Sequence, residues 1–293
     1  GKLCASPAGR PGCAELPWSL DTAARARHPR SVFTRLVVGL DGSAGADAAL
    51  NAAVSIGRPD QATIVLAAVT DIRLLEAPLF EAAGPLWTEG VPVAPVAADL
   101  REALDERARR HLAEGVAKVE AAGLPSETEH AVGIVDEELL RLAEQADAMV
   151  IGRRGELHTE PGKIGAVTAH GVRKSPKPVL VAGDRPSDFR RPAAAFDGGE
   201  TSTGALDCAA RLAAERKLPL DILHVHDEPA EARATLDRAL AVALRRGVTA
   251  RAHALQGDVV AAVAAWVARN DADLLVAGAP GGRGTPWPRG SHA

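Results

Sequence analysis

The chain is poor in several features that mark whole classes of protein. Its 293 residues include three cysteines, which are too few and too scattered for a disulfide framework. No apolar run approaches the roughly 18 residues that a membrane-spanning helix needs. The formal net charge of −4 gives no electrostatic case for nucleic acid, which is bound by a concentrated basic face. We therefore expect a soluble, cytoplasmic protein with neither a nucleic-acid nor a membrane partner.

A sustained hydrophobic period is also missing at the start of the chain. Residues 1–34 hold four prolines and scattered arginines, and they lack the apolar segment of a secretory signal. Cys4 and Cys13 lie here, but no second pair or histidine cluster completes a metal site. We expect a flexible N-terminal tail over residues 1–34.

The rest of the chain contains one pattern twice. With a constant shift of 156 positions, the stretch around Asp41 aligns with the stretch around Asp197. Further on, Gly152 aligns with Gly278 at a shift of 126. The smaller shift places an insertion in the first copy, mostly within residues 72–98. Two matching blocks in the same order indicate an internal duplication.

The insertion at 72–98 is too apolar for a bare linker, since it contains Leu74, Leu75, Phe80, Leu86 and Trp87. We expect a surface loop packed on its own domain, and the alternative is a flap over a binding site or a partner contact.

Both copies alternate strands and helices, which predicts an α/β fold with a parallel sheet between helices. In the first copy we expect strands at 35–40, 62–69, 127–132, 148–152 and 178–182 and helices at 44–57, 98–122, 135–146 and 164–174. In the second copy we expect strands at 192–196, 219–225, 249–255 and 273–277 and helices at 201–216, 229–246 and 258–269. The chain then divides into a domain at 35–184, a linker at 185–191 and a second domain at 192–293. We expect this second domain to be incomplete, because its last helix and last strand are missing.

A loop with a specific glycine spacing follows the fourth strand. Gly152 and Gly155 come first, and Gly165 follows nine residues later at the start of a helix. Glycine lets a backbone approach oxyanions closely, and a helix N-terminus supplies unpaired N–H groups and a favourable dipole. This spacing predicts a phosphate-binding loop, in which Gly165, Ala166 and Val167 turn their N–H groups toward the phosphates.

The same loop carries positive charge and a hydroxyl. Arg153, Arg154, His158 and Lys163 suit a polyphosphate, and Thr168 adds a hydroxyl near the helix start. These basic residues could instead form a solvated face.

Ligands of parallel sheets bind beyond the carboxyl ends of the strands, where the strand order reverses. Asp41 directly follows the first strand and could accept hydrogen bonds from ribose hydroxyls, although an aspartate there can also serve as a turn or helix cap. Thr70 and Asp71 end the second strand and could line the adenine side. In the second copy Asp197 remains, but we expect no complete pocket there and a structural or regulatory role.

Three motifs together resemble the universal stress protein family in its tandem two-domain form. They are Val-Val-Gly-Leu-Asp-Gly-Ser at 37–43, the Gly152-x2-Gly155-x9-Gly165 loop and Pro-Lys-Pro-Val-Leu-Val at 176–181. The resemblance covers roughly residues 35–281. It implies a five-stranded, Rossmann-like fold of the adenine-nucleotide-hydrolase type, frequent dimers, and a division into members that bind ATP and members that do not. On that similarity Asp41 would hold ribose, while Gly152, Gly155, Gly165 and Thr168 would hold the phosphates of ATP, with or without Mg²⁺.

One departure from the family pattern is Ala166, which stands where the family has serine or threonine. The N–H group remains, and the missing hydrogen bond is worth about 0.5–1.5 kcal/mol. The leading interpretation is an ATP-binding stress protein in which nucleotide changes assembly or partner binding, through paired domains or a homodimer. It is at most a slow ATPase, because no catalytic triad, metal cluster or carboxylate pair has convincing spacing.

Two alternatives remain. One is a dimeric interaction scaffold of the same fold that binds no nucleotide. The other is an ATP pyrophosphatase, which is disfavoured because Asp197 replaces the first serine of the Ser-Gly-Gly loop and a carboxylate there would repel phosphate.

Overall fold

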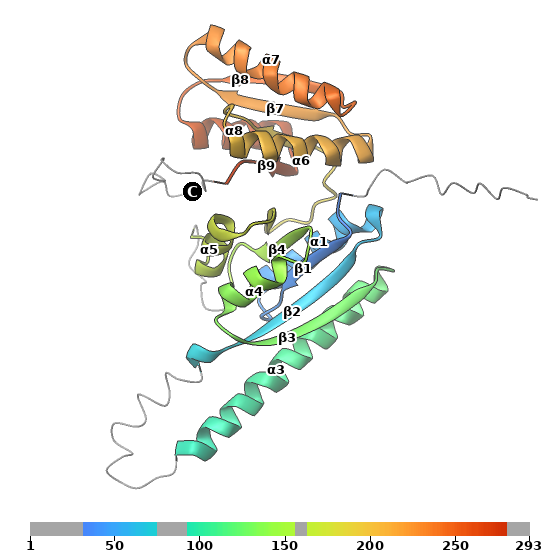
Figure 1. Ribbon diagram of the computed structural model, residues 1–293, viewed down its shortest axis with the longest axis vertical. Helices are drawn as coiled ribbons and strands as arrows, with labels where there is room; N and C mark the ends of the chain where they lie inside the picture. Colours follow the sequence, from blue (N-terminus) through green and yellow to red (C-terminus); the bar gives the residue numbers. More distant parts are fainter. Residues whose placement is uncertain (1–31, 75–92, 156–162, 280–293) are drawn as a thin grey trace, which may run out of the picture. The chain divides into compact units, whose positions relative to one another are not determined.

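The computed structural model describes residues 32–74, 93–155 and 163–279 (Figure 1). These residues build two parallel sheets that follow one another along the chain, one from each copy of the repeat. The N-terminal segment up to residue 31, the middle of the insertion, His158 and the chain after residue 279 lie outside the described residues. The predictions made for those segments therefore stay predictions.

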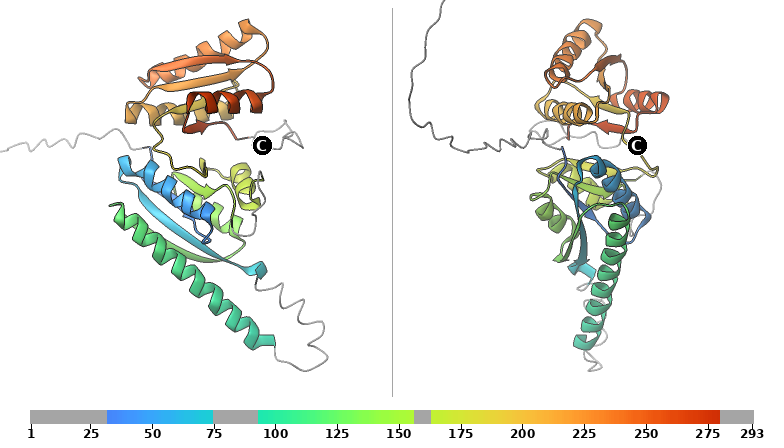
Figure 2. Two further views of the ribbon diagram at one scale, coloured as in Figure 1. Left: turned by 180° about the vertical axis from the view of Figure 1, so that it is seen from behind. Right: turned by 90° about the vertical axis from the view of Figure 1, so that its right-hand side faces the viewer.

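The first sheet has five parallel strands in the order β3-β2-β1-β4-β5. Helices α1 and α3 cover one face over a large apolar core, and α4 and α5 pack on the other (Figure 2). The strands are β1 (Arg35–Gly39), β2 (Thr63–Asp71), β3 (Ser126–Gly133), β4 (Ala148–Gly152) and β5 (Val179–Ala182). The helices are α1 (Ala44–Gly57), the 3-10 turn η1 (Arg58–Asp60), α3 (Val93–Ala121), α4 (Val135–Ala143) and α5 (Ala166–Lys174).

The second sheet repeats the first four positions in the order β8-β7-β6-β9. Helices α6 and α7 pack on one face and α8 on the other. Among the described residues no strand pairs with the outer edge of β9, where β5 would lie in the first copy. The elements are β6 (Pro192–Ala195), α6 (Glu200–Arg216), β7 (Leu220–Val225), α7 (Pro229–Arg245), β8 (Ala250–Leu255), α8 (Val259–Asn270) and β9 (Leu274–Val276).

An aspartate makes the same contacts in both copies, in agreement with the alignment at these positions. Asp147 begins the turn into β4, and its Oδ2 accepts the N–H of Thr34 at 2.6 Å and of Arg35 at 2.9 Å. Asp273 occupies the matching place before β9 and accepts the N–H of Arg190 at 2.8 Å and of Arg191 at 2.7 Å. Each carboxylate thereby fixes the start of the central strand of its sheet to the neighbouring strand.

The predicted element order is confirmed, and most boundaries agree closely. Helix α3 starts at Val93 instead of residue 98, because Pro95 lies in its first turn, where a missing N–H costs no helical hydrogen bond. Helix α4 ends at Ala143 instead of residue 146, since Gln145 and Ala146 turn back to bond Leu142 and Ala143 in tight three-residue steps.

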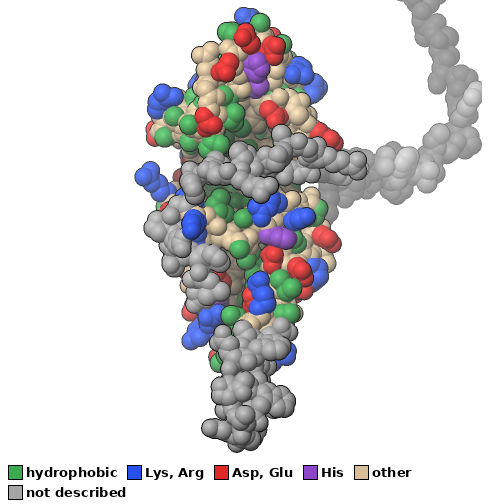
Figure 3. All heavy atoms as spheres, turned by 90° about the vertical axis from the view of Figure 1, so that its left-hand side faces the viewer, with side chains coloured by type: hydrophobic (Ala, Val, Ile, Leu, Met, Phe, Trp, Pro, Cys, Tyr) green, Lys and Arg blue, Asp and Glu red, His purple; other side chains and the backbone are tan. Residues whose placement is uncertain are grey.

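The surface of the described part carries charge of both signs. On the face that Figure 3 displays, acidic and basic side chains are interspersed with hydrophobic ones, over both sheets. No helix in this part of the chain is both long and apolar enough to cross a membrane.

Candidate functional site

The strand order of the first sheet brings two distant segments together. Strands β1 and β4 are neighbours, with Leu36 opposite Ala148 and Val38 opposite Val150. Because the strands are parallel, the turn after β1 and the loop after β4 leave the sheet at the same edge. This is the point where the strand order reverses, so the fold itself places Asp41 beside the glycine loop.

Gly155 lies directly against the carboxylate of Asp41. A β-carbon at position 155 would fall 2.6 Å from the Asp41 Oδ2 atom, which is closer than such atoms can approach. Gly152 is equally confined, since a β-carbon there would overlap the backbone of Gly45 in the first turn of α1. The backbone of Gly45 therefore requires glycine at position 152, whereas a side chain at position 155 would displace the Asp41 carboxylate.

Asp41 also shapes its own turn. Its Oδ1 accepts the N–H of Ser43 at 2.9 Å, and the Ser43 hydroxyl in turn accepts the N–H of Ala46 as the N-cap of α1. The turn-forming role considered for Asp41 is thus present, but the helix cap belongs to Ser43. The second carboxylate oxygen faces Gly155, so Asp41 takes part in both the turn and the candidate site.

The loop closes on the start of α5. The N–H of Gly165 donates to the carbonyl of Arg153 at 3.0 Å, and Gly165 is the N-cap residue without a side-chain cap bond. The first N–H groups of a helix have no partner within it, and here they belong to Ala166, Val167 and Thr168. Together with the positive end of the helix dipole they form a place where an anion would be stabilised.

Thr168 is held on the protein side of this helix start. Its side chain is buried, with the residue 4% exposed, and its hydroxyl donates to the carbonyl of Gly152 at 2.7 Å. This bond fixes α5 to the end of β4. The contact between its hydroxyl and phosphate remains a prediction, and its demonstrated contact is with the backbone.

The basic residues of the loop differ in exposure. Arg153 and Arg154 are half-buried, whereas Lys163 is exposed. The backbone of Arg154 packs tightly against Gly45, so the loop lies close to the first turn of α1 along its first residues.

Thr70 lies at the end of β2 on the side covered by α3. It is 4% exposed, and its hydroxyl donates to Asp105 Oδ1 at 2.9 Å and lies 3.0 Å from His130 Nε2. Asp71 bonds Arg73 instead. Burial acts to raise the pKa of Asp71, but the bonds from Arg73 outweigh it and the pKa lies below its usual range. The adenine role assigned to this strand end remains a prediction.

Three residues near the site carry no motif in the sequence. Asp105 and His130 complete the cluster around Thr70, and Gly45 gives room for the loop. The position of Gly45 in the first turn of a predicted helix indicates close packing against another segment, because glycine is otherwise unfavourable in a helix. Neither Asp105 nor His130 had such a signal, since both lie in regions of ordinary polar sequence.

The second copy keeps the aspartate, but there its carboxylate is hydrogen-bonded to residues of the turn and helix that follow it. Asp197 Oδ1 accepts the Ser202 hydroxyl at 2.5 Å and the Gly199 N–H at 2.8 Å, and these bonds hold the pKa of Asp197 below its usual range. Gly278 packs against the backbone N–H of Ser202, as Gly152 packs against Gly45. The segment that would continue this loop lies beyond the described residues.

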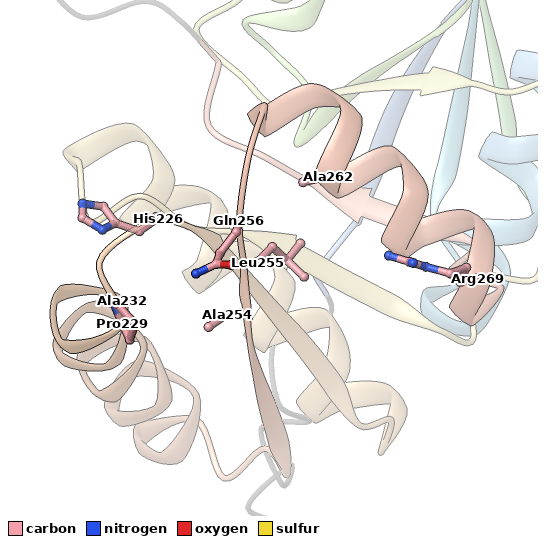
Figure 4. Close-up of a pocket in the computed structure, with 8 residues that line it drawn as sticks. All are labelled: His226, Pro229, Ala232, Ala254, Leu255, Gln256, Ala262 and Arg269. Carbon is pink, nitrogen blue, oxygen red and sulfur yellow. The ribbon is translucent and has the colours of Figure 1, made fainter.

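A separate cavity of about 340 Å³ lies at the carboxyl ends of β7 and β8 (Figure 4). It is lined by side chains of mixed character: His226, Pro229, Ala232, Ala254, Leu255, Gln256, Ala262 and Arg269. Within the described ranges no group of three or more histidine, cysteine or acidic side chains could hold a metal ion.

The architecture and the site together define a doubly wound parallel α/β protein with a glycine loop and an aspartate at its switch point. The model of the universal stress protein family matches residues 33–183, which is just over half of the chain. The chain belongs to the universal stress protein family.

One solved structure supports the fold over most of the chain, and others are similar over about half of it. A universal stress protein from Archaeoglobus fulgidus has a TM-score of 0.65 at 20% identity, covering 83% of this chain and 85% of its own. A universal stress protein in complex with cAMP has a TM-score of 0.39 at 27% identity and covers 53% of this chain and 100% of its own. A family protein from Arabidopsis thaliana with AMP bound has a TM-score of 0.36 at 16% identity, covering 51% and 90%. A search of curated proteins finds no match.

Proposed function

We propose that the first copy binds an adenine nucleotide, specifically ATP with or without Mg²⁺, and that the chain is a nucleotide-responsive stress protein that hydrolyses ATP slowly at most. The observation that carries this proposal is the contact between Gly155 and the Asp41 carboxylate. It joins a group that can accept hydrogen bonds from ribose hydroxyls to a loop that ends at a helix N-terminus.

The residues present fit such a ligand. In the proposed complex Asp41 accepts from ribose, and the N–H groups of Ala166 and Val167 face the phosphates. The Gly165 N–H, which the sequence also assigned to the phosphates, donates instead to the carbonyl of Arg153. Arg153 and Lys163 add positive charge at the phosphate end. Bound nucleotide would stabilise the contact between the glycine loop and the β1–α1 turn. Through this contact, binding would alter the assembly of a homodimer or the pairing of the two copies. We place the protein in the cytoplasm.

A second candidate is an interaction scaffold that binds no nucleotide. It is favoured by the start of α5, where Ala166 lacks a hydroxyl and the Thr168 hydroxyl is engaged with Gly152. Among the described residues, the donors of the phosphate end are then backbone N–H groups and basic side chains, without a further hydroxyl.

Isothermal titration of the whole chain with ATP distinguishes the two candidates. We expect saturable binding that weakens in Asp41→Ala and in Lys163→Ala. A well-folded chain that gives no heat at millimolar ATP, and whose melting temperature ignores the nucleotide, would support the scaffold and exclude the nucleotide proposal.

A further inference from the structure

A basic side chain of the long helix α3 lies on the glycine that follows Asp41. A β-carbon at Gly42 would fall 2.6 Å from His111 Nε2, so the imidazole rests against the backbone of the turn. Gly42 has a φ of +81°, a conformation that favours glycine, and its missing side chain gives the ring its place. His111 therefore lies against the residue that follows Asp41, although 69 positions separate it from Gly42 in the sequence.

Packing of α3 fixes the ring there. Gly115, one turn further along, approaches Leu40 so closely that a β-carbon would lie 2.8 Å from its Cδ1. Lys118 forms a 2.6 Å ion pair with Asp47 of α1. The helix is thus anchored to the end of β1 and to α1 on both sides of the turn.

Contacts with the protein cover only part of the His111 ring. The His111 side chain is 21% exposed, and its Nδ1 lies 3.9 Å from Glu114, the one charged group paired with it in the described part of the chain. No hydrogen bond to either ring nitrogen is formed there. An imidazole nitrogen can donate or accept, and its ring offers a flat face.

The two sides of the Asp41–Gly42 turn carry different chemistry. Gly155 approaches Asp41 from the glycine loop, where α5 begins and where phosphates would lie. His111 approaches Gly42 from α3, a different element from the glycine loop. A nucleotide whose ribose lies on Asp41 and whose phosphates reach α5 has its nucleoside portion on the α3 side.

We propose that His111 contacts the nucleoside portion of the bound nucleotide and contributes nothing specific to the phosphates. This inference rests on the proposed nucleotide function and adds a binding residue on α3 to it. The second copy offers an internal comparison, because Arg238 of α7 lies on Gly198 in the same way, 3.0 Å from where a β-carbon would be. Arg238 sits beside Asp197 of the second copy and lies outside the proposed site.

The test compares three ligands that share the nucleoside: ATP, AMP and adenosine. Isothermal titration is carried out on the whole chain with His111→Ala, with Lys163→Ala as the phosphate-end variant and with Arg238→Ala as the matched control. We expect His111→Ala to weaken all three ligands by a similar factor of about ten, which corresponds to 1.4 kcal/mol. Lys163→Ala should weaken ATP far more than adenosine, and Arg238→Ala should change none of the affinities. His111→Gln, which keeps a hydrogen-bonding group, should recover part of the loss.

Melting temperatures of all variants show whether each is folded, and His111→Leu, which fills similar space without a hydrogen-bonding group, replaces the alanine variant if that one is not. Unchanged affinities in the folded variant overturn the inference, and so does a loss confined to ATP, which would place His111 at the phosphates. A wild-type chain that binds none of the three ligands overturns the nucleotide function itself, so the two failures are distinguishable.

Discussion

At the scale of single residues, the candidate site depends on positions that carry no side chain. Gly155 leaves room for the Asp41 carboxylate, and Gly42 leaves room for the His111 ring. Each contact joins segments that are far apart in the sequence. Adding one methyl group at such a position is consequently the most sensitive test of the geometry, because nothing else about the loop changes.

Gly155→Ala should reduce ATP affinity at least about tenfold, a loss of about 1.4 kcal/mol. The added β-carbon would lie 2.6 Å from Asp41 Oδ2, so the carboxylate must leave the position proposed for ribose. Titration with ATP measures the effect. Gly183→Ala is the matched control, since a β-carbon there meets nothing within 4 Å and should leave affinity unchanged. Equal affinities for both variants would show that the Gly155–Asp41 contact does not shape the site.

Sequence reasoning identified some of these residues and missed others for a physical reason. Asp41 and the glycine spacing follow from the strand pattern, because the end of a strand fixes which residues reach the ligand edge. His111 lies on α3. The apolar periodicity of this helix predicts which of its faces is buried, but it does not predict which residue of another segment contacts His111. The Thr168 hydroxyl was predicted from its position alone, and its bond to Gly152 depends on how far α5 leans onto β4.

At the scale of elements, α5 and β4 determine how the site is presented. The start of α5 supplies N–H groups, and Ala166 at its first position is exposed to solvent. The order and type of the elements could be read from the sequence, because alternating apolar strands and amphipathic helices leave one parallel arrangement. The start of α3 could not, since Pro95 is compatible both with a loop and with a first helical turn.

Ala166→Thr should strengthen ATP binding by up to about tenfold. The added hydroxyl lies at the first position of α5, and one further hydrogen bond is worth about 0.5–1.5 kcal/mol. Ala166→Val has nearly the same shape without the hydroxyl, so it separates the hydrogen bond from any effect of bulk. Titration of both variants with ATP and with adenosine measures the gain, which should be absent for adenosine. Equal affinity in the threonine and valine variants would place the phosphates away from this helix start.

Asp147→Asn should destabilise the chain at pH 7 by about 1 kcal/mol, the difference between charged and neutral hydrogen bonds. Burial acts to raise the pKa of Asp147, but bonds from Thr34 and Arg35 outweigh it and the folded pKa is lowered. A lowered folded pKa stabilises the fold above the unfolded pKa, near 3.9. That contribution is lost as pH falls through the folded value.

The difference in the free energy of unfolding between wild type and Asp147→Asn, measured by denaturant titration from pH 7 to about pH 3, should therefore shrink as the pH falls below about 3.9. The control is Asp188→Asn, because the Asp188 side chain is 77% exposed and joins no strands. A difference that stays constant over the whole pH range would mean that the charge of Asp147 contributes nothing.

At the scale of the whole molecule, duplication produced two sheets with the same strand order and different ligand edges. Each aspartate accepts the N–H two residues further on, Asp41 from Ser43 and Asp197 from Gly199. Asp197 also accepts the Ser202 hydroxyl, whereas the second oxygen of Asp41 faces Gly155. Both copies kept the contacts that hold the fold, such as the Asp147 and Asp273 anchors. Within the described residues, the copies therefore differ in the contacts of Asp41 and Asp197 and are alike where the strands begin.

This divergence predicts one ATP per chain. Titration should give a stoichiometry near one, with Asp41→Asn removing most of the heat and Asp197→Asn leaving it unchanged. The asparagine at 197 keeps an oxygen that can accept from Ser202 and Gly199, so the second copy should stay folded and the comparison is fair. A stoichiometry near two, with half of the heat lost in each variant, would show that the second copy also binds nucleotide. In that case residues after 279 would have to complete its loop, because the described residues end directly after Gly278 and Ala279.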